Sequence, residues 1–183
     1  MMKKGIYLLL AGLLVWTSAQ AQDQIKWYSI EEAIQMAGKE PRVMVIDVYT
    51  DWCGWCKRMD ATTFKDPSIV SLMNEKFYPV KLNAEGKEDI VIGDHTYKFV
   101  DNGSRATHEM AAVVTQGRLS YPTISYIDGR GRILQIAPGY KTVDQLKIHL
   151  DYFNEGAYTS EDFETFKAAR EGQPAAPSVI QNL

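Results

Sequence analysis

Apolar and polar positions follow two periods along the chain, which predict a mixture of helices and strands. A serine or threonine followed three residues later by Glu or Gln, ahead of helically spaced apolar residues, predicts helix starts at Ser29 and Thr142. Short runs rich in β-branched and aromatic residues predict strands. The expected helices cover residues 29–38, 53–59, 67–75, 105–116 and 160–171, with one more opening at Thr142. The expected strands are 43–49, 77–82, 123–127 and 133–137, with a small hairpin within residues 90–100.

The order of these elements predicts one α/β domain. Helices and strands alternate first, and a hairpin and a helix follow. This order favours a central mixed sheet of about four to five strands with helices on both faces. We expect the domain to cover residues 22–158, and residues 159–183 to add a helix and a flexible tail.

The first 21 residues have the pattern of a secretory signal peptide. Two lysines precede an apolar run over residues 6–16, which is shorter than the roughly 20 residues that span a bilayer. Ala19-Gln20-Ala21 then offers a cleavage site before Gln22. We therefore expect a periplasmic or secreted protein without a stable membrane anchor after cleavage. An uncleaved anchor is the alternative.

Charge argues against one class of partner. The formal net charge of the full chain is −3, and loss of the two lysines with the signal peptide makes it −5. No cluster of Lys and Arg interrupts this acidic balance. The sequence therefore gives no support for nucleic-acid binding.

Cys53 and Cys56 are the only cysteines of the chain, and they directly follow the predicted strand 43–49. A structural disulfide is one alternative, but the pair closes a loop too short to restrict the unfolded chain much. A zinc site is another, but it needs about four ligands, and the three histidines lie far apart in sequence. We therefore expect dithiol–disulfide chemistry with no metal, and no cofactor beyond the cysteine pair.

The predicted helix start gives the two cysteines different roles. Cys53 lies where unpaired backbone N–H groups favour negative charge, so we expect it to be the nucleophilic thiolate and the more exposed sulfur of the two. Cys56, one turn later, is expected to be buried and to resolve the mixed disulfide. Gly54 leaves room for a partner chain, and Trp52 and Trp55 offer flat apolar surface for binding it.

Residues 52–57, Trp-Cys-Gly-Trp-Cys-Lys, resemble the active site of the thioredoxin superfamily. Asp47 matches the buried acid of that family, and Lys81 matches the lysine that partners it. The cis-proline loop that faces the cysteines is matched by Tyr121, Pro122 and Thr123. The resemblance covers residues 29–153 and implies a thioredoxin-like fold.

The resemblance also implies roles for these residues. Asp47 would take the proton of Cys56, Lys81 would stabilise the acid, and Pro122 would hold a strand edge open for substrate. The chain departs from thioredoxin between the cysteines, after Phe153, and in an insertion over residues 84–117. That insertion would place His108 and Glu109 on a solvated helical face near the site.

These features are similar to those of exported bacterial thiol:disulfide interchange proteins. We expect a thiol–disulfide oxidoreductase that reduces disulfides in exported proteins and is supplied by a membrane or periplasmic electron donor. The reductive direction rests on Gly54-Trp55, which adds no positive charge to stabilise a thiolate. A net oxidase or isomerase, favoured by Lys57 and Arg58, and a non-catalytic binding module are the alternatives.

Overall fold

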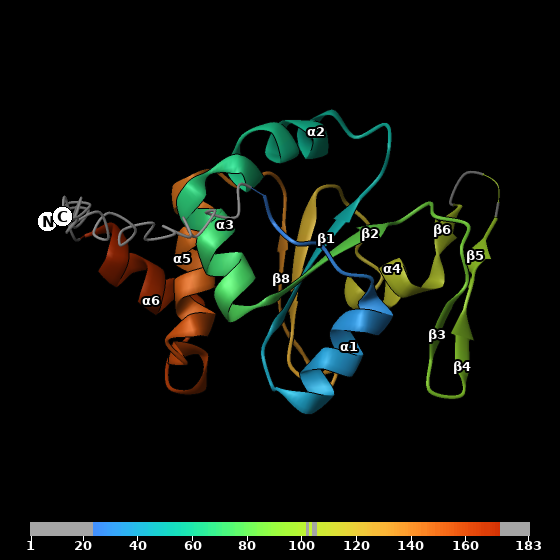
Figure 1. Ribbon diagram of the computed structural model, residues 1–183. Helices are drawn as coiled ribbons and strands as arrows, with labels where there is room; N and C mark the ends of the chain where they lie inside the picture. The colour runs from blue at the N-terminus through green and yellow to red at the C-terminus, as the bar shows by residue number, and fades with distance from the viewer. Residues whose placement is uncertain (1–23, 102, 104–105, 173–183) are drawn as a thin grey trace, which may run out of the picture.

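A four-stranded mixed sheet forms the centre of the molecule in a computed structural model, which describes residues 24–101, 103 and 106–172 (Figure 1). Its strand order is β2-β1-β7-β8, with β1 and β2 parallel and the other neighbours antiparallel. The strands are β1 (Met44–Tyr49), β2 (Tyr78–Asn83), β7 (Thr123–Ile127) and β8 (Ile133–Pro138). The predicted mixed sheet is confirmed. The expected signal peptide and the tail after residue 172 lie outside the described residues.

Helices cover both faces of this sheet (Figure 1). On one face lie α1 (Ile30–Lys39) and α4 (Glu109–Val114). On the other lie α3 (Pro67–Lys76), α5 (Val143–Asn154) and α6 (Phe163–Glu171), with the short turns η1 (Thr63–Lys65) and η2 (Ala157–Thr159). Helix α2 (Gly54–Ala61) follows β1 and buries Met59 in the apolar cluster on the α3 and α5 side of the sheet. No helix in the described part of the chain has the length and apolar character needed to cross a membrane.

Local capping signals fix where three helices begin. Ser29 and Glu32 form the predicted capping box at α1, and Thr142 and Gln145 form the one at α5. Asp66 accepts a hydrogen bond from the Ser68 N–H at the start of α3. Each cap satisfies backbone donors that a helix start would leave unpaired.

The alternation of side chains along β1 sends an acid to one face of the sheet. Met44, Ile46 and Val48 pack against the α1 and α4 side. Val45 packs on the opposite side, and because side chains alternate, Asp47 projects toward that face as well. The parallel register pairs Asp47 with Lys81 of β2. Two charged side chains are thereby placed next to each other within the sheet.

The insertion between β2 and β7 differs from its sequence-based prediction. A second strand pair follows the one hairpin expected within residues 90–100, and residues 97–100 are divided between the two pairs. These are β3 (Ile90–Ile92) with β4 (His95–Tyr97), and β5 (Phe99–Val100) with β6 (Thr107–His108). The short strands lie outside the central sheet, on its α1 and α4 side (Figure 1).

The predicted helix over residues 105–116 was wrong at its start, because α4 begins at Glu109. His108 ends β6 and caps α4, accepting a hydrogen bond from the Met110 N–H through Nδ1 at 3.1 Å. Its Nε2 lies 3.0 Å from the Glu88 carbonyl oxygen. Both ring nitrogens have structural partners and the side chain is buried, so the expectation of a solvated His108 was also wrong.

The C-terminal helix α6 packs against α5 through aromatic side chains. Phe166 is buried, with its ring centroid 5.2 Å from that of Tyr152. Phe163 stacks on His149 at 4.0 Å. The helix expected after residue 158 therefore contributes to the same apolar cluster as α3 and α5.

Truncation of Phe166 tests this contribution. We expect Phe166→Ala to lower the free energy of unfolding by about 3 kcal/mol, because it removes a buried ring and leaves a cavity. Glu164→Ala, on the exposed surface of the same helix, should change it by less than about 0.5 kcal/mol. Denaturant unfolding of both variants measures the difference, and equal stabilities would contradict the packing role.

Candidate active site

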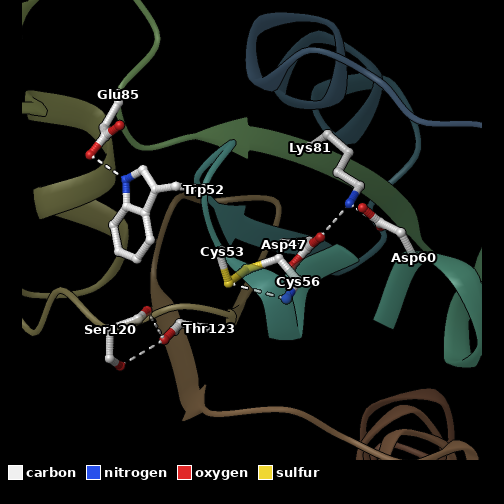
Figure 2. Close-up of a disulfide and its surroundings, with 9 residues drawn as sticks. All are labelled: Asp47, Trp52, Cys53, Cys56, Asp60, Lys81, Glu85, Ser120 and Thr123. Atoms are coloured by element: carbon white, nitrogen blue, oxygen red, sulfur yellow. Dashed lines mark hydrogen bonds and ion pairs between the residues drawn. A yellow bond between two sulfur atoms is a disulfide. The ribbon is translucent and has the colours of Figure 1, made fainter. Parts of the chain in front are cut away.

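A disulfide joins Cys53 and Cys56 at the start of α2, with their Cα atoms 5.3 Å apart (Figure 2). Cys53 is the N-cap residue, and its Sγ accepts a hydrogen bond from the Cys56 N–H at 3.1 Å. The Cys53 N–H in turn donates to the Thr50 carbonyl oxygen. The sulfur of Cys53 therefore lies where backbone donors can stabilise a thiolate.

Both cysteines are buried in this oxidised state. The exposed fraction is 4% for Cys53 and 2% for Cys56. The expectation that Cys53 is the more exposed of the two agrees with these values, although the oxidised protein buries both residues. The burial of Cys56 agrees with expectation.

Asp47 is 1% exposed and lies between the disulfide and the ammonium group of Lys81 (Figure 2). Its Oδ2 accepts a hydrogen bond from Lys81 Nζ at 2.7 Å. Its Oδ1 is buried and has no hydrogen-bond partner among the residues that the structure describes. One carboxylate oxygen is thus neutralised by a cation, and the other is available to a proton donor.

Lys81 also contacts a second acid, Asp60, which the sequence analysis missed. Asp60 lies on α2, four residues after Cys56, so the two share a helix face. The position of Asp60 four residues after Cys56 was the one feature of the sequence that could have identified this acid. The Lys81 ammonium group additionally lies 5.0 Å from the Trp27 ring centroid and 4.9 Å from that of Tyr49. A lysine held in this way is not a freely solvated surface residue.

Asp47 and Lys81 shift each other's pKa in opposite directions. Burial raises the pKa of Asp47 to about 6, although Lys81 acts to lower it. Burial opposes the charge of Lys81, but attraction to Asp47 and hydrogen bonds to both acids give its pKa a net increase. Asp47 can therefore exchange a proton near neutral pH while Lys81 stays charged.

A loop with a cis peptide bond between Tyr121 and Pro122 leads into β7. Thr123 closes the loop by donating its hydroxyl to the Ser120 carbonyl oxygen at 2.7 Å. The Pro122 carbonyl oxygen accepts a hydrogen bond from the N–H of Gly139, whose φ of +84° suits glycine. Figure 2 places Ser120 and Thr123 on the side of the disulfide away from Lys81.

Two exposed tryptophans flank the cysteines, at 66% exposure for Trp52 and 57% for Trp55. Trp52 packs edge-on against Tyr121, with ring centroids 5.9 Å apart, and Trp55 lies 5.4 Å from Tyr140. A Cβ atom at Gly54 would meet nothing within 4 Å. The fold itself therefore does not require glycine at this position. The missing side chain leaves space for an approaching partner.

The structure thus brings Cys53, Cys56, Asp47 and Lys81 together, and places Trp52 beside Tyr121. Within residues 24–101, 103 and 106–172, no three His, Cys, Asp or Glu side chains form a group that could hold a metal ion. The chemistry that this arrangement supports is thiol exchange coupled to a buried proton acceptor.

Comparison with known proteins gives a family and a fold. A family model described as "Thioredox_DsbH: Protein of unknown function, DUF255" matches residues 14–144. A solved thioredoxin-fold protein from Helicobacter pylori is similar with a TM-score of 0.57 and 18% identity, covering 84% of this chain and 91% of that one. A solved DsbH oxidoreductase gives a TM-score of 0.53 and 13% identity, covering 83% and 95%. The central sheet and its helices therefore have the thioredoxin fold.

Among curated proteins, the chain is 23% identical over 118 residues to thiol:disulfide interchange protein DsbD from Pectobacterium atrosepticum. That match covers 63% of this chain and 17% of DsbD. The chain spans 9% of the first curated relatives that it matches. These relatives are much longer proteins.

The buried acid makes stability depend on pH. Unfolded Asp47 ionises near its ordinary pKa of 3.8, whereas the folded protein holds the proton up to about 6. Stability is therefore lost as pH rises from 4 to 6, and the penalty persists above that range. The free energy of unfolding of Asp47→Asn minus that of the wild type should be about 2–3 kcal/mol larger at pH 8 than at pH 4. Denaturant unfolding of the oxidised proteins measures this, and a difference independent of pH would contradict it.

Proposed function

Because the chain belongs to the Thioredox_DsbH family, we propose that it is a thiol–disulfide oxidoreductase of the cell envelope that reduces disulfides in exported proteins. The observation that carries the proposal is the Cys53–Cys56 disulfide at the start of α2, beside the buried Asp47–Lys81 pair. A disulfide at a helix N-cap with a proton acceptor beneath it has the parts that thiol exchange needs.

The reaction starts from the reduced protein. The Cys53 thiolate attacks one sulfur of the substrate disulfide and expels the other as a thiolate, which forms a mixed disulfide. Cys56 then gives its proton to Asp47 and attacks the Cys53 sulfur. The substrate leaves with two thiols after protonation, and the protein keeps the Cys53–Cys56 disulfide. Two electrons pass to the substrate, and no cofactor besides the cysteine pair takes part.

Charge around the cysteines supports the reductive direction. Asp47 and Asp60 bring two carboxylates to the site, and Lys81 supplies one opposing charge. The excess negative charge disfavours a thiolate, which destabilises the reduced form and lowers the reduction potential. Lys57 and Arg58, exposed on α2, act the other way and favour net oxidation or isomerisation as the second candidate.

We place the protein in the periplasm or outside the cell after cleavage near Ala21. The proposal rests on the sequence of residues 1–21. Thiols outside the cytoplasm are oxidised readily, so a reductase there needs a membrane or periplasmic electron donor. Amino-terminal sequencing of the protein from an envelope fraction tests this, since a mature chain beginning at Gln22 is expected.

Replacement of the second cysteine should arrest the reaction midway. We expect Cys56→Ser, mixed with a disulfide-containing protein of known sequence, to accumulate a mixed disulfide through Cys53, because no thiol remains to resolve it. Cys53→Ser serves as the matched control and should accumulate at most a trace. Non-reducing electrophoresis with mass spectrometry identifies the linkage. Absence of the adduct would refute the proposed enzyme activity. If cells that carry Cys53→Ser keep the function of the wild-type protein, a non-catalytic binding module would be favoured.

Removal of the second acid should change the redox equilibrium. We expect Asp60→Asn to raise the reduction potential of the cysteine pair on the order of 10–30 mV, because the thiolate loses a nearby negative charge. Titration against glutathione measures the potential of both proteins. Asp94→Asn, in the exposed β3–β4 turn, is the control and should leave it unchanged. An unchanged or lower potential in Asp60→Asn would contradict the proposed effect of this charge on the thiolate. A wild-type potential of about −120 mV would contradict the reductive direction.

A further inference from the structure

The two tryptophans beside the disulfide belong to walls of opposite charge. We define the Trp52 wall as Trp52, Tyr121, Asp51 and Glu85, and the Trp55 wall as Trp55, Tyr140 and Arg58. Each wall pairs an exposed indole ring with a tyrosine from another part of the chain. Exposed apolar surface framed by polar groups marks an interaction site.

The Trp52 wall is acidic and is held in place by the insertion. Trp52 Nε1 donates a hydrogen bond to Glu85 Oε1 at 2.9 Å (Figure 2). Asn83 links the two acids of the wall, donating to Asp51 Oδ2 at 3.2 Å and accepting from the Glu85 N–H at 2.9 Å. Within the described residues, neither acid forms an ion pair. Their negative charge is therefore available to a partner.

The Trp55 wall is basic. The Arg58 guanidinium carbon lies 5.4 Å from the Trp55 ring centroid and 5.9 Å from that of Tyr140. In the part of the chain that the structure describes, Arg58 has no acidic partner. The stacked guanidinium is held in one place at a small entropy cost, so its charge has a defined position.

The walls lie on opposite sides of one reactive sulfur. Trp52 immediately precedes Cys53, and its ring turns toward the insertion, whereas Trp55 packs toward Tyr140 before α5. A partner segment must pass between the two walls to bring its own sulfur to Cys53. Its residues on either side of the cysteine therefore meet charges of opposite sign. Complementary charge at such positions sets association rate and register more than affinity.

Resting on the proposed function, we propose that these walls select an extended partner segment with a basic side chain on the Glu85 side of its cysteine and an acidic one on the Arg58 side. We expect the loop at Pro122 to bind the segment through main-chain hydrogen bonds, which fix the direction of the segment. The substrate class is thus an exported polypeptide whose disulfide lies between charges of opposite sign, in one order along the chain.

Two isomeric peptides test the proposal. One has the order Lys-Ala-Cys-Ala-Glu and the other Glu-Ala-Cys-Ala-Lys, each with blocked ends and a mixed disulfide to mercaptoethanol. The reduced protein releases the peptide thiol and mercaptoethanol and becomes the disulfide, so chromatography of free peptide gives the rate. We expect one order to react about three- to tenfold faster at low salt, as two exposed ion pairs would give, and the preference to vanish in 1 M NaCl.

Charge reversal provides the decisive comparison. The double variant Glu85→Lys/Arg58→Glu should prefer the other peptide order. Glu85→Gln keeps an acceptor for Trp52 Nε1 but removes the charge, and it should lower the rate ratio while Asp94→Asn leaves the ratio unchanged. Because each protein is judged by a ratio of two peptides, a general loss of reactivity does not affect the result.

The outcomes separate this proposal from the function on which it rests. If the two peptide orders react within about twofold in the wild type at low salt, while a peptide with alanine at both charged positions is reduced, the charged walls do not select substrate and the oxidoreductase remains. If no peptide and no small disulfide is reduced, the proposed function itself fails. A preference that the double variant does not invert also overturns the role of the walls.

Discussion

The arrangement of the site depends on one buried carboxylate. Asp47 lies on the central β1 strand, where nearly every neighbouring group is apolar, and one of its oxygens has no partner among the described residues. Such a group is costly to bury unless a cation compensates it. The parallel register of β1 and β2 provides that cation by placing Lys81 directly opposite. The strand pairing therefore supplies the compensating charge, and burial of the carboxylate beside the disulfide costs stability once the pH exceeds the raised pKa of about 6.

The reactive sulfurs are controlled from two directions. From inside the domain, Asp47 and Lys81 of the sheet and Asp60 of α2 contribute to the charge near the cysteines. From the surface, the Trp52 wall and the Trp55 wall are proposed to select the segment that reaches Cys53. The first group lies on β1, β2 and α2. The Trp52 wall lies on loops outside these elements, whereas the Trp55 wall shares α2 with Asp60. The Trp52 wall can therefore change without altering Asp47, Lys81 or Asp60.

Sequence patterns predicted the parts of the structure that local interactions determine. The capping boxes at Ser29 and Thr142 and the cysteine pair at a strand end are short-range signals, and the helices and central strands followed them. Asp60 was missed because its partner, Lys81, is 21 residues away and meets it through tertiary packing.

The insertion resisted prediction for a related reason. Strands of two or three residues carry almost no periodicity, and their pairing is decided by contacts such as the His108 N–H donating to the Ala84 carbonyl oxygen. Residue types identified the chemistry, whereas long-range contacts determined its electrostatic setting.

The route of the chain from β2 to β7 has an evolutionary consequence. These strands are not neighbours, because β1 lies between them, so the connection must leave the sheet and return. The entropy cost of lengthening such a connection grows slowly with its length. Descendants of this gene can therefore rewrite the segment that supports Trp52 while inheriting an unchanged sheet. One ancestral redox core can in this way acquire new clients by the exchange of a single surface segment.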